Sequence, residues 1–150
     1  MTRLPRFALL ALILMPACNG DDEASAVGDY VDGVDGYTRN ICACEYDNPL
    51  VLVTLLKAPY ASSEACLMDL PPNAAERGCI DGLFQDQSVD YAAVLDCRAA
   101  ALGRSSACLQ GKTCTDTARG DCYLDLNDEI KSCPDLPDDV ETKLNDCLYN

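Results

Sequence analysis

The sequence contains no histidine, no tryptophan and only two phenylalanines among its 150 residues. Histidine is the commonest general base and a common zinc partner of cysteine, so its absence excludes Ser-His and Cys-His catalytic arrangements. No tryptophan or aromatic cluster offers a platform on which a sugar ring would stack. Carboxylates and thiols are the catalytic candidates weighed below.

Basic residues are also scarce. Eleven Lys and Arg residues oppose 25 Asp and Glu residues, which gives a formal net charge of −14. An acidic surface of this kind repels nucleic-acid phosphates and anionic lipid headgroups. We therefore expect no nucleic-acid partner and no membrane binding through a basic patch. The acidic surface is compatible with binding of cations or basic partners, or it serves only solubility.

Cysteine, in contrast, is plentiful. The eleven cysteines are spread along the chain instead of being grouped in short metal-binding pairs, which indicates disulfides and an oxidising compartment. The length suits one domain, and the 49% hydrophobic fraction is that of a folding protein. The sequence predicts one small, disulfide-rich domain with no cofactor and no metal.

Residues 1–17 have the pattern of a secretory signal peptide. Arg3 and Arg6 precede an apolar run at 7–15, which is shorter than the roughly 20 residues that a transmembrane helix needs. The run ends at Pro16, and polar and acidic residues follow shortly after it. We therefore exclude this segment from the predicted fold.

The junction after the apolar run resembles the lipobox of bacterial lipoproteins, with Ala17 before Cys18, although Met15 and Pro16 differ from the residues that the family favours. The resemblance implies that Cys18 carries a diacylglycerol thioether and begins the mature chain. The alternative is ordinary cleavage after the Ala-Ser-Ala site at 24–26. Either event removes one cysteine from the pairing pool and leaves ten, enough for five disulfides.

Residues 18–37 are rich in Asp, Glu, Gly and Ser, a composition that buries too little apolar surface to offset the entropy of ordering. We interpret them as a lipid-anchored flexible tether in front of a cysteine-rich helical domain at 38–150. Asp29, Asp32 and Asp35 recur every third residue, whereas an EF-hand loop spaces its ligands every second residue and ends with glutamate. The spacing therefore does not predict a calcium site.

Capping patterns predict helices along the domain. Asn48, followed by proline, is typical of a helix start, and we interpret the apolar run 50–56 as helix, although periodicity alone does not separate helix from strand there. Ser62 is a predicted N-cap for a short helix. Asn73 and Glu76 have the spacing of a capping box for the next helix.

Four cysteines are arranged in mirror symmetry about position 115. Cys97 and Cys108 are separated by ten residues, and so are Cys122 and Cys133. Eleven positions make about three helical turns, so each pair lies on one face of its helix. The spacing predicts a helical hairpin closed by the disulfides Cys97–Cys133 and Cys108–Cys122.

The hairpin is expected to consist of helices at about 88–110 and 116–132, with Ser88 as N-cap and Gly111 as a left-handed C-cap. A last helix begins after Asp135, and we expect it to pack back along the hairpin. Six cysteines keep their partners open: Cys42, Cys44, Cys66, Cys79, Cys114 and Cys147.

Pairing Cys66 with Cys79 and Cys114 with Cys147 would leave the two remaining cysteines, Cys42 and Cys44, to bond each other in a small strained ring. We therefore expect these two to bond outward to two different partners, which the sequence does not identify.

The hairpin spacing resembles the twin Cys-x9-Cys hairpins of the coiled-coil-helix family, with ten residues here in place of nine. The resemblance implies inner and outer disulfides across two helices and no function. As a whole, from Cys18 to the cysteine-rich helices, the chain is similar to small cysteine-rich lipoproteins of myxobacteria-like secretomes. That similarity implies an envelope location without a defined activity.

The predicted fold is therefore all-α, a small disulfide-stapled helical bundle built from helical hairpins. The predicted function is that of a non-catalytic lipoprotein. It would be a binding or structural module with an unidentified protein partner, held by lipid on Cys18 at the periplasmic face or the surface of a bacterial envelope, or otherwise secreted.

Two alternatives stay open. One is a thiol-redox or metal-handling protein that uses Cys42-x-Cys44, which is disfavoured because Glu45 and Asp47 would raise the pKa of the two thiols. The other is a carboxylate-dependent hydrolase, for which no spacing singles out a catalytic pair.

Overall fold

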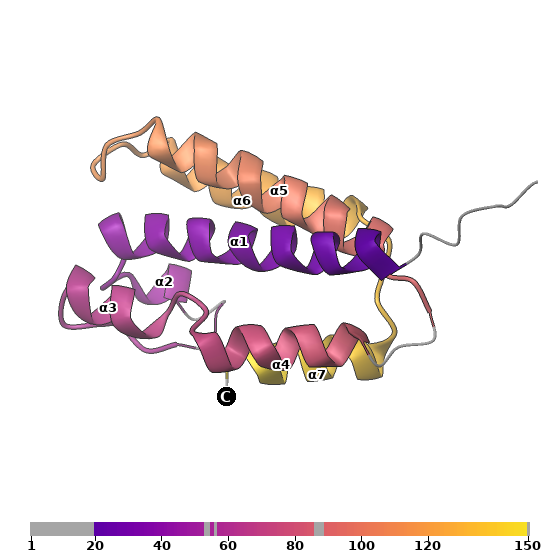
Figure 1. Ribbon diagram of the computed structural model, residues 1–150. Helices are drawn as coiled ribbons and strands as arrows, with labels where there is room; N and C mark the ends of the chain where they lie inside the picture. Colours follow the sequence, from indigo (N-terminus) through magenta and orange to yellow (C-terminus); the bar gives the residue numbers. More distant parts are fainter. Residues whose placement is uncertain (1–19, 53–54, 56, 86–88, 150) are drawn as a thin grey trace, which may run out of the picture.

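A 25-residue helix, α1 (Gly20–Cys44), runs through the middle of the molecule (Figure 1). The computed structural model describes residues 20–52, 55, 57–85 and 89–149, and all regular structure in these residues is helical. The predicted signal peptide at 1–17 and the predicted lipid attachment residue Cys18 lie outside the described residues. The fold class is therefore the all-α bundle that the sequence predicts.

Six further helices follow α1 along the described chain. They are α2 (Pro49–Leu52), α3 (Ser63–Asp69), α4 (Ala74–Gln85), α5 (Ala92–Gln110), α6 (Arg119–Ser132) and α7 (Asp138–Tyr149).

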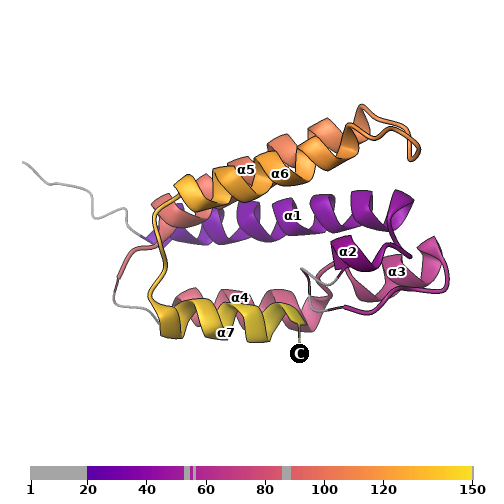
Figure 2. The same ribbon diagram turned by 180° about the vertical axis from the view of Figure 1, so that it is seen from behind.

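The helices form three layers. The antiparallel pair α5 and α6 lies on one side of α1, and the pair α4 and α7 lies on the other (Figures 1 and 2). The short helices α2 and α3 lie beside the C-terminal end of α1. Because α1 packs against α3, α4 and α5, it lies between the two helix pairs and contributes to the main core that both pairs share.

The tether prediction for residues 18–37 is wrong from Gly20 onward, because these residues belong to α1. Its apolar side chains are few but recur at helical spacing, and five of them are at least 93% buried in the main core: Ala26, Val27, Tyr30, Val31 and Val34. Tertiary packing of one apolar face stabilises a helix that composition alone disfavours. The helical domain therefore begins at least eighteen residues before the predicted boundary at 38.

Two glycines allow α1 and α5 to approach closely. A Cβ added at Gly33 would lie 3.2 Å from the Cβ of Leu102, and one at Gly36 would lie 3.5 Å from the Ser106 hydroxyl. The same close contact includes a hydrogen bond of 2.7 Å from the Asn40 amide to the Ser106 hydroxyl. The Gly residues among the aspartates of this segment thus serve helix packing and not a metal-binding loop.

The α5–α6 hairpin contains both disulfides that the mirror spacing predicts. Cys97 bonds Cys133 and Cys108 bonds Cys122, with Cα atoms 5.7 and 5.9 Å apart. Both distances are normal for disulfides.

Other local predictions differ in part. Helix α5 begins at Ala92, where the Asp90 carboxylate accepts its amide hydrogen at 2.8 Å, and the predicted cap Ser88 lies outside the described residues. Gly111 ends α5 with a right-handed φ of −75°, so the predicted left-handed cap is wrong. Helix α6 begins at Arg119, three residues after the predicted start, because the preceding residues form turns.

The predicted caps of the shorter helices are present. The Ser62 hydroxyl accepts the Ala65 amide hydrogen at 3.1 Å, and Asn73 and Glu76 form the reciprocal capping box. The run at 50–56 begins as helix α2, which ends at Leu52; residues 53, 54 and 56 lie outside the described part.

The remaining six cysteines form three disulfides. Cys42 bonds Cys66 and Cys44 bonds Cys114, so both members of Cys42-x-Cys44 bond outward as expected. Cys79 bonds Cys147, which joins α4 to α7. The pairings Cys66–Cys79 and Cys114–Cys147 are absent, and α7 packs against α4 instead of the hairpin.

The placement of α7 follows from its apolar face. The buried residues Val140, Leu144 and Cys147 lie on one face of α7 and join the same core cluster as Ile80 and Phe84 of α4. The helix therefore buries its apolar face in the layer on the opposite side of α1 from the hairpin.

Candidate functional site: a tyrosine-lined cleft beside an acidic recess

A cleft of about 560 Å³ lies between the two outer helix pairs. Four tyrosines line it, and we call it the tyrosine cleft after them: Tyr30, Tyr37, Tyr123 and Tyr149. Helices α6 and α7, which form its walls, lie in front of α5 and α4 in Figure 2, with α1 between them. A volume of this size is typical of small-molecule sites in proteins.

The helical repeat of each wall explains why these side chains meet. Tyr30, Val34 and Tyr37 are at i, i+4 and i+7 on α1, and Tyr123 and Ile130 are at i and i+7 on α6. Two stripes of apolar and aromatic residues therefore face one space. The α2 residues Leu50 and Val51 also line it.

The phenols of the cleft remain protonated across the physiological range. Burial, followed by the neighbouring Tyr149, raises the pKa of both Tyr30 and Tyr37. Burial, followed by the Glu45 carboxylate, raises the pKa of Tyr123. Burial is also the main cause that raises the pKa of Tyr149. Neutral phenols supply aromatic faces and hydrogen-bond donors, but they do not act as bases at neutral pH.

One ion pair crosses the cleft. Arg98 of α5 donates two hydrogen bonds to the Glu141 carboxylate of α7, at 2.7 and 3.1 Å. The Arg98 side chain is 11% exposed, and that of Glu141 is 38% exposed. The two charges cancel, so this end of the cleft is polar without carrying net charge.

The hydroxyl of Thr38, which also lines the cleft, donates to the Val34 carbonyl oxygen at 2.8 Å. Threonine is a nucleophile only when an adjacent base activates its hydroxyl. In this cleft the Thr38 hydroxyl is thus engaged by a backbone carbonyl of its own helix.

A second recess of about 430 Å³ adjoins the cleft, and Leu50, Val51, Gly120 and Tyr123 line both. We call it the acidic recess because Glu45, Asp47 and Asp116 also line it, against the single base Arg119. Within the described residues, neither Asp47 nor Asp116 has a basic partner within ion-pair distance.

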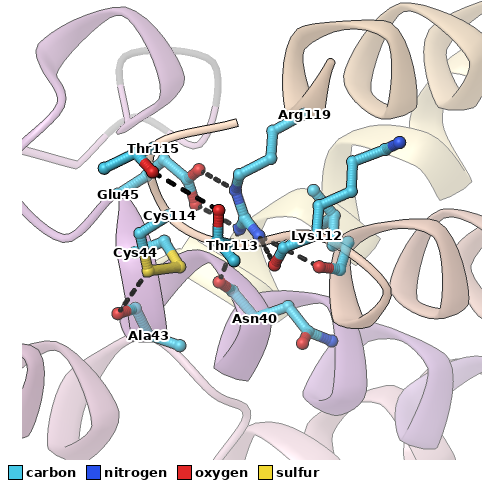
Figure 3. Close-up of a disulfide and its surroundings, with 10 residues drawn as sticks. Asn40, Ala43, Cys44, Glu45, Lys112, Thr113, Cys114, Thr115 and Arg119 are labelled. Carbon is cyan, nitrogen blue, oxygen red and sulfur yellow. Dashed lines mark hydrogen bonds and ion pairs between the residues drawn. A yellow bond between two sulfur atoms is a disulfide. The ribbon is translucent and has the colours of Figure 1, made fainter. Parts of the chain in front are cut away.

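Glu45 and Arg119 form a buried ion pair at the back of the recess (Figure 3). Arg119 is 4% exposed and Glu45 is 8% exposed. The guanidinium also donates to the carbonyl oxygens of Leu109 at 3.0 Å and Asn40 at 3.3 Å. Arg119 therefore binds backbone carbonyls in the C-terminal turns of both α5 and α1.

Both cysteines of the predicted Cys42-x-Cys44 site are disulfide-bonded in this fold. Cys42 and Cys66 are fully buried in the smaller core, whereas the Cys44–Cys114 disulfide forms part of the wall of the acidic recess (Figure 3). The two cysteines belong to different disulfides, so they are not a dithiol pair. Among the described residues, no three Cys, Asp or Glu side chains are placed to hold a metal ion.

Two exposed apolar side chains lie at the openings of these spaces. Leu50 is 80% exposed and Leu124 is 66% exposed, and both line the tyrosine cleft. Large exposed apolar residues that rim a concavity mark binding sites more often than those that are scattered singly. Sequence reasoning missed this site, although the seven-residue spacing of Tyr30 and Tyr37 was a signal for a shared helical face.

The structure also bears on location. Five disulfides indicate that the folded chain belongs in an oxidising, extracellular type of environment. No helix in the described ranges has both the length and the hydropathy needed to span a bilayer. Comparisons with known protein families, with curated proteins and with solved structures find no match for this chain.

Proposed function

We propose that this protein is a non-catalytic binding module of the bacterial envelope whose ligand site is the tyrosine cleft. The observation that supports this most directly is a concavity of about 560 Å³ with apolar and aromatic walls and one polar ion pair. Small-molecule sites have this combination of an apolar lining and a few fixed polar groups. The disulfides restrict the motion of the helices that form the walls, which lowers the entropy cost of binding.

The module is non-catalytic in this proposal because the cleft combines protonated phenols with a satisfied threonine and a neutral ion pair. The thiol-redox alternative makes a different prediction. Alkylation of the denatured, non-reduced protein after export will find no free thiol in the mature chain if all ten cysteines are bonded. Two or more alkylated cysteines per chain would favour a redox or metal-handling role.

A filling substitution tests the cleft. Gly120 lines both the cleft and the recess, and a Cβ added there meets no other atom within 4 Å. Gly120→Phe therefore places a ring in the binding space without a clash at its Cβ. We expect it to weaken binding of the neutral aromatic probe phenylbutanol by about tenfold or more, measured from the amide NMR shifts of the cleft residues.

The matched control is Gly103→Phe on α5. Gly103 is exposed and helical like Gly120, and its added Cβ also meets nothing within 4 Å, but it lines neither space. This variant should bind phenylbutanol as the parent does. Equal affinities for the two variants, or no shifts at the cleft residues of the parent, would overturn the cleft as a ligand site.

We further propose that the module is held at the membrane by a diacylglycerol group on Cys18. The position of α1 supports this over cleavage after the Ala-Ser-Ala site, because cutting after Ala26 would remove the first turns of α1 and a side chain that is 1% exposed. Cleavage before Cys18 leaves the whole of α1 intact.

Mass spectrometry of the full-length precursor, expressed in a bacterium and purified from membranes, tests the anchor. We expect a mature chain that begins at Cys18 and carries the mass of the lipid. Cys18→Ser should lose that mass and leave the membrane fraction. A mature chain that begins at Val27 would contradict the anchor and favour ordinary secretion.

A further inference from the structure

We infer that the ligand of the cleft is an amphiphilic organic cation, with an apolar or aromatic body in the tyrosine cleft and an amine head directed to the acidic recess. This inference rests on the proposed function and adds the chemical class of the ligand. Its basis is the uneven distribution of charge along two adjoining spaces.

The acidic recess carries an unbalanced negative charge. Glu45 is paired with Arg119, so its charge is compensated, whereas Asp47 and Asp116 line the same recess without a basic partner among the described residues. Both side chains are exposed, so their carboxylates reach water and an incoming ligand. The Asp116 carboxylate accepts the Ala118 amide hydrogen at 2.9 Å, which fixes its position at the start of α6.

The tyrosine cleft has no such excess. Its one pair of charges, Arg98 and Glu141, is bidentate and mutually neutralised. A carboxylate ligand would have to compete with Glu141 for Arg98 and would enter against a formal net charge of −14. A cationic ligand is favoured instead, because an acidic surface attracts it over a distance and tyrosine faces bind ammonium groups favourably.

Because the two spaces are connected, one ligand can place its apolar body in the tyrosine cleft and its head group in the acidic recess. Leu50, Val51, Gly120 and Tyr123 line both, so the apolar walls adjoin the recess that holds the two aspartates. A single molecule that fills the cleft can therefore extend its polar end past Gly120 toward Asp47 and Asp116.

Three probes that differ only in the head group test this inference: phenylbutylamine, phenylbutanol and phenylbutyrate, each titrated into the disulfide-intact protein at neutral pH. From the usual strength of exposed ion pairs, we expect the amine to bind on the order of fivefold tighter than the alcohol. The butyrate should bind most weakly. Raising the ionic strength from ~0.01 M to ~1 M should remove most of the amine's advantage, because the Debye length falls from ~30 Å to ~3 Å.

A charge-neutralising double variant locates the effect. Asp47→Asn with Asp116→Asn should reduce amine affinity to that of the alcohol and leave alcohol affinity unchanged, and asparagine preserves a capping oxygen at position 116. The matched control is Asp125→Asn with Asp128→Asn, which removes the same charge from exposed positions of α6 that line neither space.

The outcomes of these experiments distinguish a failure of the cation inference from a failure of the proposed cleft. Equal affinity of the amine and the alcohol, with Gly120→Phe still weakening both, would overturn the cation and leave the cleft as a binding site. Tightest binding by the butyrate would overturn the cation in favour of an anion at Arg98. An equal loss of amine affinity in both double variants would show general attraction to an acidic surface and contradict the recess as the head-group site. Failure of all three probes to shift the cleft residues would overturn both statements.

Discussion

At the scale of single residues, Arg119 has more buried polar contacts than any other side chain discussed above. Its guanidinium contacts the Glu45 carboxylate and the carbonyl oxygens of Asn40 and Leu109, so it links the ends of α1 and α5 to the start of α6. A buried charge of this kind is tolerated because its hydrogen bonds are nearly all satisfied. Removing one partner should therefore cost more than removing a surface pair.

We predict that Glu45→Ala lowers the free energy of unfolding by about 3–5 kcal/mol, because it leaves Arg119 buried without its counter-charge. Urea unfolding of the disulfide-intact protein measures the change. Arg104→Ala is the control, since Arg104 is 60% exposed and pairs with Glu129 at the surface, and it should cost no more than about 1 kcal/mol. Equal losses for the two variants would contradict a special role for the buried pair.

Ionisation of the cleft tyrosines is expected to limit the stability of the protein at alkaline pH. Their folded pKa values lie above the ordinary value of 10.0, so an unfolded chain ionises these phenols first. A raised folded pKa contributes stability that is fully present below the unfolded pKa and lost as pH rises above it. We therefore expect stability to fall above about pH 10.

The measurement is a pH titration followed by phenolate absorbance and circular dichroism together. The buried phenols should ionise in the same step in which helicity is lost. Ionisation of Tyr30 and Tyr37 with the helical signal intact would show that these side chains are accessible to solvent in the folded state.

At the scale of elements, α1 shows how packing overrides composition. It contains four glycines, three of them in its interior, where glycine costs roughly 1 kcal/mol relative to alanine. A side chain at Gly33 would crowd Leu102 of α5, whereas an added Cβ at Gly28 meets nothing within 4 Å. The two positions should therefore respond oppositely to the same substitution.

We predict that Gly28→Ala raises the free energy of unfolding by up to about 1 kcal/mol through helix propensity alone. Gly33→Ala should give no gain or a loss, since the new methyl group must displace Leu102. Thermal or urea unfolding of both variants provides the comparison. A similar gain at both positions would contradict the close approach of α1 and α5.

Several features of the fold were predictable from the sequence because they depend on local patterns, whereas helix α1 was not predicted. Ser62 and the Asn73–Glu76 capping box depend on neighbours within one turn, and the mirror spacing of Cys97 to Cys133 concerns a single hairpin, so local patterns predicted all of them. Helix α1 was missed because its composition is polar, although Val27, Tyr30, Val31 and Val34 already have helical spacing. A search for periodicity in that segment would have found it.

The pairing of Cys79 with Cys147 and the tyrosine cleft depend on how distant helices pack. The sequence left the partner of Cys79 open, because α4 packs along α7, which is more than fifty residues further on. Likewise, Tyr30 and Tyr123 line the same cleft only because α1 lies between the outer layers. No local pattern carries that information.

At the scale of the whole molecule, the five disulfides differ in accessibility. Cys42 and Cys66 are both fully buried, whereas Cys114 is exposed in the turn between α5 and α6. Thiol–disulfide exchange requires access of the attacking thiolate to a sulfur atom. The disulfides should therefore be reduced in an order that follows their burial.

We predict that limited reduction opens Cys44–Cys114 before Cys42–Cys66. Alkylation after increasing reductant, followed by peptide mass spectrometry, gives the order directly. Early loss of Cys42–Cys66 while Cys44–Cys114 persists would mean that the smaller core opens more readily than its burial indicates.

The disulfides also hold the molecule together when a single peptide bond is broken. The rings closed by Cys42–Cys66, Cys44–Cys114 and Cys79–Cys147 overlap in sequence, so every peptide bond between Cys42 and Cys147 lies inside at least one ring. A single protease cut anywhere in that span leaves both fragments joined. Outside the cell, a nicked molecule would thus keep its full mass and its helix layers in register, and backbone damage would appear only when the disulfides are reduced.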